Sequence, residues 1–167
     1  MEDSTSRVLG RRADLMHLVP SPWDRAKFLA ALGEWRGRPI RLMPVEAAAL
    51  PGVWDPGRGT PCGLWLDTDE ADVIAFALGT TDFHVDQILM HEVGHMVLDH
   101  SRDEDGGLVG LEQLLPGIDP ATIRRVLGRS EFVSWQEDEA ELFADLMLSS
   151  TSRWRKTTPM RSFWREG

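Results

Sequence analysis

The chain has 167 residues, of which 42% are apolar, and a formal net charge of −9. This length and apolar fraction fit one domain with a single hydrophobic core. The acidic balance argues against nonspecific nucleic-acid binding by the domain as a whole. The apolar runs are short, residues 1–4 lack the layout of a signal peptide, and the lone Cys62 leaves no internal disulfide. We therefore expect a cytoplasmic protein without a membrane span.

In chain order, we predict an N-terminal arm over residues 1–20, a folded domain over residues 21–150 and a basic C-terminal tail over residues 151–167. The domain begins with a helix, because Ser21 can act as N-cap before Pro22, and Gly37 ends it. Residues 38–45 alternate in polarity and contain Pro44, which predicts a strand near a sheet edge.

Residues 46–51 are expected to form a short helical turn or a loop, and the glycine- and proline-rich residues 52–61 a loop. Two apolar runs, 63–66 and 72–78, flank an acidic turn and predict a β-hairpin. An acidic loop is expected over residues 99–110.

A further helix is predicted to begin at Asp119-Pro120 and to end at Gly128, because a capping residue stands directly before a proline.

The most informative stretch is His91-Glu92-Val93-Gly94-His95, in a predicted helix that Thr81 or Asp82 caps. Residues four apart lie on one face of a helix, so His91 and His95 can bind one metal ion. Glu92 lies beside them and can serve as a general base for a water that the metal activates. The spacing predicts a catalytic zinc site rather than a site that only binds metal.

A catalytic zinc usually has a third protein ligand, and the acidic stretch 134–147 is the candidate region. At about 100° per residue, Glu139 falls within the apolar stripe of that predicted helix, with Trp135, Phe143 and Leu146, which we expect to be buried near the zinc. Such a carboxylate is a metal ligand, the partner of a buried cation, or a sign that the helical register is wrong.

Other polar residues near the motif have simpler expected roles. Glu137 completes a capping box with Ser134. Asp145 can orient a ligand histidine. His17 and His100 are interpreted as structural, since His100 faces away from the ligand pair on the helical wheel.

The segments HEVGH (residues 91–95) and EDEAELFADL (residues 137–146) resemble the ImmA/IrrE family of zinc metallopeptidases, whose signature is HExGH followed by ExEAxxFAxxL. Stretches 38–44, 61–66 and 114–120 are also similar to small actinobacterial members, so the resemblance covers about residues 22–150. It implies a zincin-like α+β fold of the gluzincin type, in which a small, mostly antiparallel sheet packs against the HExxH helix. A second helix carries the glutamate ligand.

Mapped onto this chain, the resemblance implies zinc ligands His91, His95 and Glu139, with Glu92 as the base. It implies a metallo-endopeptidase that cleaves a helix-turn-helix (XRE-type) transcriptional repressor and so relieves repression. The chain contains no tyrosine, so any oxyanion-stabilising role passes to a group such as His84 or to the metal alone. The alternative function is a zinc-containing regulatory or toxin-antitoxin component that acts mainly by protein binding.

Overall fold

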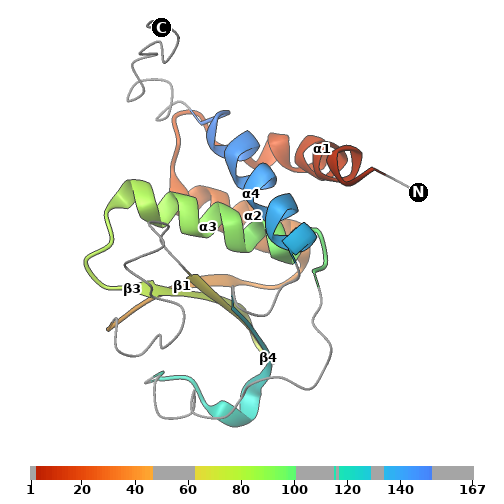
Figure 1. Ribbon diagram of the computed structural model, residues 1–167. Helices are drawn as coiled ribbons and strands as arrows, with labels where there is room; N and C mark the ends of the chain where they lie inside the picture. Colours follow the sequence, from red (N-terminus) through yellow and green to blue (C-terminus); the bar gives the residue numbers. More distant parts are fainter. Residues whose placement is uncertain (1–2, 47–62, 101–114, 116, 129–133, 152–167) are drawn as a thin grey trace, which may run out of the picture.

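The computed structural model describes residues 3–46, 63–100, 115, 117–128 and 134–151. Four helices gather on one face of a four-stranded sheet (Figure 1): α1 (Ser4–Leu15), α2 (Arg25–Arg36), α3 (Asp82–Val97) and α4 (Ser134–Leu148). The strands are β1 (Ile40–Val45), β2 (Gly63–Thr68), β3 (Asp72–Ala77) and β4 (Ile123–Gly128). The predicted α+β class with a small sheet is confirmed.

The sheet is mixed, with the strand order β1-β3-β2-β4. Strand β1 is parallel to β3, whereas β2 is antiparallel to both β3 and β4. The predicted hairpin is therefore confirmed as β2 and β3, with Trp65 opposite Ile74. Strand β1 lies at an edge, as its proline indicated, because Pro44 cannot donate a ladder hydrogen bond.

The helix predicted from Asp119-Pro120 to Gly128 is wrong. Only a single 3-10 turn, η4 (Pro120–Thr122), follows Asp119, and the chain then continues as strand β4. Its backbone pairs with β2, with Val126 opposite Leu66. The side chains of β2 are buried throughout, so an unpaired β2 would expose an apolar edge. Tertiary pairing outweighs the local capping signal here, since strand preference depends strongly on context.

The N-terminal segment also differs from the expected arm. It forms helix α1, which buries Val8 and Leu15 and packs against α4. A short 3-10 helix, η1 (Met16–Leu18), follows it.

Helix α2 begins three residues later than predicted, because Ser21 was expected to be its N-cap. Its N-cap is Asp24, whose carboxylate accepts a hydrogen bond from the Lys27 N–H at 3.0 Å. Its predicted end is confirmed, because Gly37 adopts the left-handed conformation, with φ = 77°, that closes many helices.

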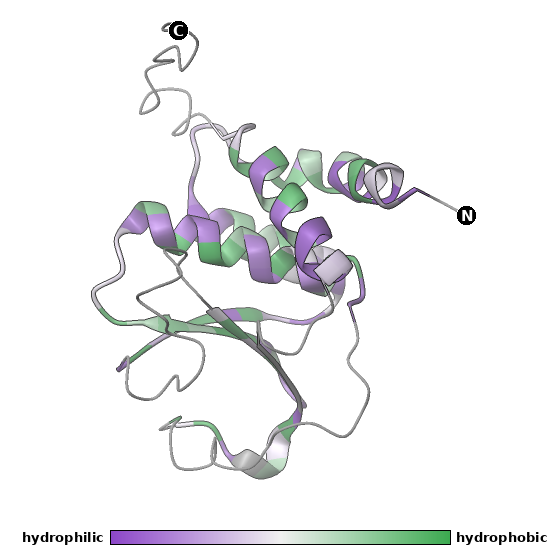
Figure 2. Cartoon of the chain, in the orientation of Figure 1, coloured by the Kyte–Doolittle hydropathy of each residue, from purple (hydrophilic) through white to green (hydrophobic). Residues whose placement is uncertain are grey.

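Helix α3 lies between the sheet and α4, and it is buried along most of its length. Figure 2 shows the strands mostly in the colours of apolar residues, while α1 and α4 alternate between polar and apolar faces. This central position explains why α3 is apolar on two sides, as predicted from its sequence. Within the described ranges, no helix combines the length and apolar character that crossing a membrane requires.

Several predictions fall on residues outside the described ranges. These are the loop over residues 52–61, most of the segments 46–51 and 99–110, Cys62, and the basic tail after Thr151.

Candidate metal centre

Helix α3 brings the two motif histidines together. Its N-cap is Thr81, as predicted, whose hydroxyl accepts a hydrogen bond from the His84 N–H at 3.4 Å. One turn separates His91 from His95, and their Nε2 atoms lie 3.0 Å apart. His95 is buried, whereas 19% of the His91 side chain is exposed. The pair therefore has one buried member and one that solvent can reach.

The third group at this position is Glu137, from the first turn of α4. Its Oε1 lies 3.3 Å from His95 Nε2, and its Oε2 lies 3.5 Å from His91 Nε2. Two ligands at about 2.0–2.1 Å from a tetrahedral zinc are about 3.3 Å apart, so the three spacings fit such an ion. His91, His95 and Glu137 form a group that could hold a metal ion.

Glu139, the ligand expected from the sequence, lies elsewhere. It is buried as predicted, but its Oε2 is 2.9 Å from His100 Nε2 and 3.1 Å from the Arg7 guanidinium. Its carboxylate is therefore the partner of a partly exposed cation, Arg7, and of the buried His100, rather than of the two motif histidines. The described group that could hold a metal ion thus contains Glu137 and not the expected Glu139.

The helical wheel failed because it centred the buried face of α4 on large side chains. The backbone of α4 instead lies close against Gly94 of α3 at Ala140, whose side chain is small. At about 100° per residue, Glu137 lies about 60° from Ala140, whereas Glu139 lies about 100° away on the other side. Glu137 thus faces α3 beside the contact, and Glu139 faces α1.

Two further expectations for α4 are also wrong. Trp135, expected to be buried near the metal, is 47% exposed. Asp145, expected to orient a ligand histidine, is exposed. Phe143 is fully buried, as predicted.

His100 is the residue that the sequence interpretation missed. It lies just after α3, is buried, and its Nδ1 is 2.9 Å from Nδ1 of His95. The wheel placed it on the wrong side because the chain leaves the helix after Leu98, and Asp99 adopts φ = 53°. The sequence signal that could have identified His100 is its position as a third histidine, five residues after His95.

Both buried imidazoles are held in the neutral form. Burial, together with a smaller contribution from the neighbouring His100, lowers the pKa of His95 to about 3. Burial also lowers the pKa of His100, although the hydrogen bond to Glu139 opposes this shift. Neutral imidazole is the form that binds metal, so at neutral pH the site is ready to bind without losing protons from these rings.

Glu92, the predicted base, is buried where α3 meets the start of β2. A Cβ added to Gly63 would lie 2.9 Å from Glu92 Oε1. The absence of a side chain at Gly63 therefore leaves the space that the Glu92 carboxylate occupies.

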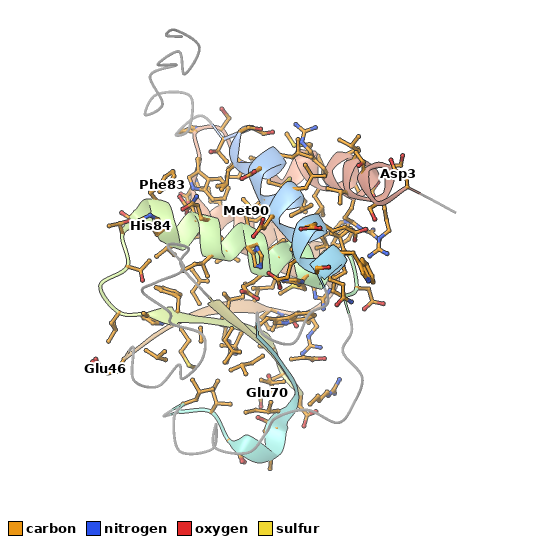
Figure 3. The ribbon with its side chains drawn as sticks, viewed as in Figure 1. Asp3, Glu46, Glu70, Phe83, His84 and Met90 are labelled. Atoms are coloured by element: carbon orange, nitrogen blue, oxygen red, sulfur yellow. The ribbon has the colours of Figure 1, made fainter. Side chains whose placement is uncertain are left out.

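His84, considered for an oxyanion role, is exposed at the N-terminal end of α3, ahead of Met90 (Figure 3). Its Nδ1 contacts the Thr81 hydroxyl at 3.0 Å. Seven residues of helix, about 10 Å along the axis, separate it from His91. This position argues against direct contact with a group bound at the histidine pair.

Two imidazoles and one carboxylate form the donor set of many hydrolytic zinc sites. Comparison with models of protein families, with curated proteins and with solved structures gives no match for this chain.

Proposed function

We propose that this protein is a zinc-dependent endopeptidase of the ImmA/IrrE type. In this proposal His91, His95 and Glu137 hold the zinc, and Glu92 is the general base. The observation that supports it is the meeting of Glu137 with both histidines, from a different helix, within the spacing of tetrahedral ligands. A chance HExxH match would have no reason to gain a third donor at that point.

Bound zinc would supply Lewis acidity, polarising the scissile carbonyl and making an attacking water more acidic. The chain's own contribution is proton transfer by Glu92, which follows the ligand His91 directly and does not belong to the donor group. Its carboxylate would take a proton from the attacking water and deliver it to the departing amide nitrogen. The peptide bond breaks, and an acid and an amine are released.

The substrate class that we propose is a protein, specifically a helix-turn-helix transcriptional repressor of the XRE type. Partial exposure of His91 and Glu137, at 19% and 16% of their side chains, supports access for a substrate chain on that side of the site. The expected output is loss of repression when the repressor is cut.

The test compares the wild-type protein with Glu92→Gln and with Glu70→Gln, an exposed acid in the β2–β3 turn that serves as control. Each zinc-loaded protein is incubated with a cell extract and with any helix-turn-helix protein that an adjacent gene encodes, and new N-termini are identified by mass spectrometry. We expect a defined set of termini with the wild type and the control, and none with Glu92→Gln or with chelator.

The alternative, a zinc-containing component that acts mainly by protein binding, predicts a different result. Glu92→Gln would then retain all regulatory output, and no new N-termini would depend on zinc. That outcome would reject the endopeptidase proposal.

A further inference from the structure

A buried hydrogen-bond chain, formed by the side chains of Glu139, His100 and His95, extends away from the candidate metal centre. Glu139 Oε2 lies 2.9 Å from His100 Nε2, and His100 Nδ1 lies 2.9 Å from His95 Nδ1. The three residues expose 4% of their surface or less. The far end of the chain is the ligand nitrogen itself, because His95 Nε2 faces His91 and Glu137.

Hydrogen-bond chemistry gives this chain a direction. An ionised carboxylate only accepts, so His100 Nε2 must carry the proton and donate to Glu139. A neutral His100 then has an unprotonated Nδ1, which can only accept. His95 must therefore carry its proton on Nδ1 and donate to His100. This leaves the lone pair of His95 on Nε2, directed at His91 and Glu137.

Arg7 of α1 lies at the Glu139 end of this hydrogen-bond chain. Its guanidinium lies 3.1 Å from Glu139 Oε2, donates to the Leu98 carbonyl at 2.8 Å, and lies 5.6 Å from the ring of Trp135. Trp135 in turn contacts the His100 ring edge-on, with centroids 5.6 Å apart. Arg7 thus places a positive charge beside the Glu139 carboxylate, the acceptor at which the direction of the hydrogen-bond chain begins.

We propose that His100 and Glu139 are positioning residues that fix His95 in the tautomer with the proton on Nδ1, and thereby set the affinity of the site for zinc. This inference rests on the proposed metal site, but not on the proposed peptidase activity. Partners of this kind fix the ring orientation and tautomer of ligand histidines, and their loss typically weakens metal binding about 10–100-fold.

The decisive variant is Glu139→Gln, which keeps the shape and removes the charge. An amide can donate as well as accept, so it permits His100 to reverse and His95 to move its proton to Nε2, where it blocks the ligand position. Asp145→Asn is the matched control, because it removes one negative charge from an exposed position on the same helix.

Two measurements use the full-length chain. The first records nitrogen chemical shifts of the histidine rings in the metal-free protein, which report the tautomer directly. The second measures the dissociation constant for Zn²⁺ by competition with a chelating dye. We expect wild type and Asp145→Asn to show His95 with Nδ1–H and the same affinity. Glu139→Gln should show a tautomer mixture and about 10–100-fold weaker binding.

Substitutions of His100 separate positioning from packing. His100→Asn retains an oxygen that can accept from His95, whereas His100→Leu fills space without an acceptor. We expect His100→Asn to retain more zinc affinity than His100→Leu, even where thermal unfolding shows that the His100→Leu protein is the more stable of the two. The Arg7 side chain is 37% exposed, so Arg7→Gln perturbs the hydrogen-bond chain without altering its three buried residues. This variant should weaken zinc binding less than Glu139→Gln.

An unchanged His95 tautomer and unchanged zinc affinity in Glu139→Gln would overturn the proposal. Wild-type protein that binds no zinc would overturn it together with the proposed function. If the variants lose affinity as expected but no substrate is cut by the wild type, the positioning role stands and only the peptidase proposal fails.

Discussion

Gly94 of α3 lies directly against Ala140 of α4. A Cβ added at Gly94 would be 3.1 Å from the Ala140 Cα and 3.2 Å from its carbonyl oxygen, closer than side chains normally pack. His91 and Glu137 each lie three residues before this contact on their own helices. The distance between these two candidate ligands therefore depends on how closely the two helices approach at this pair.

Gly94→Ala should weaken zinc binding, because the added methyl group must push α4, and with it Glu137, away from the histidines. We expect about a 10-fold rise in the dissociation constant for Zn²⁺, similar to the loss of a supporting contact around a metal site. The control is Gly10→Ala in α1, where nothing lies within 4 Å of the added Cβ. Alanine there should stabilise the helix by about 0.5–1 kcal/mol and leave zinc affinity unchanged. Equal affinities in both variants would contradict this account.

Glu137 and Glu139 should respond differently to replacement. Glu137→Ala removes a donor from the metal centre and should lower zinc affinity by more than about 100-fold, above the usual range for supporting residues. Glu139→Ala should reduce affinity less and lower the thermal stability of the metal-free protein more, because it leaves Arg7 and His100 without their carboxylate partner. Metal analysis after dialysis, with thermal unfolding of the apo forms, makes the comparison. If Glu139→Ala lost all of its zinc while Glu137→Ala kept it, Glu139 would be restored as the expected ligand.

Gly63→Ala should damage catalysis more than metal binding. The new Cβ would overlap the Ile88 side chain and approach Glu92 Oε1 to 2.9 Å, so the carboxylate must move. Displacing a catalytic group by about 1 Å can cost about 10²-fold in rate. Once a substrate is identified, kcat should fall by about that factor. Zinc affinity should change little, since the three atoms nearest to the added Cβ belong to Ile88 and Glu92 and not to a candidate ligand. A parallel loss of zinc would show that the change distorts the whole helix.

The stability of the metal-free protein should fall below neutral pH. Burial lowers the pKa of His95 from its ordinary value of 6.5 to about 3, so on acidification the unfolded chain takes up this proton first. The stabilising contribution is fully present above about pH 6.5 and is lost as the pH falls toward about 3, by about 2 kcal/mol between pH 7 and pH 5. Chemical denaturation across that range, in the presence of chelator, measures the effect. His95→Asn should flatten the slope and His17→Asn, at an exposed position, should keep it; an unchanged slope in His95→Asn would exclude this origin.

The sequence determined those features that depend on residues close together in the chain. The spacing of His91 and His95 requires only one helical turn, and the Thr81 cap and apolar flanks already favoured that helix. Alternation and turn residues were sufficient for the β2–β3 hairpin and for the edge position of β1. Gly37 marked the end of α2 because the left-handed conformation favours glycine.

Only the tertiary structure decided which glutamate reaches the histidines. The wheel for α4 counted large apolar residues, but the rotation of the helix is set by the small pair Gly94 and Ala140. Beside that contact, Glu137 faces His91 and His95, whereas Glu139 faces His100. Likewise, residues 123–128 form a strand because β2 requires a partner. In both cases a packing partner distant in sequence outweighed the local pattern, and no local pattern records which partner a face will meet.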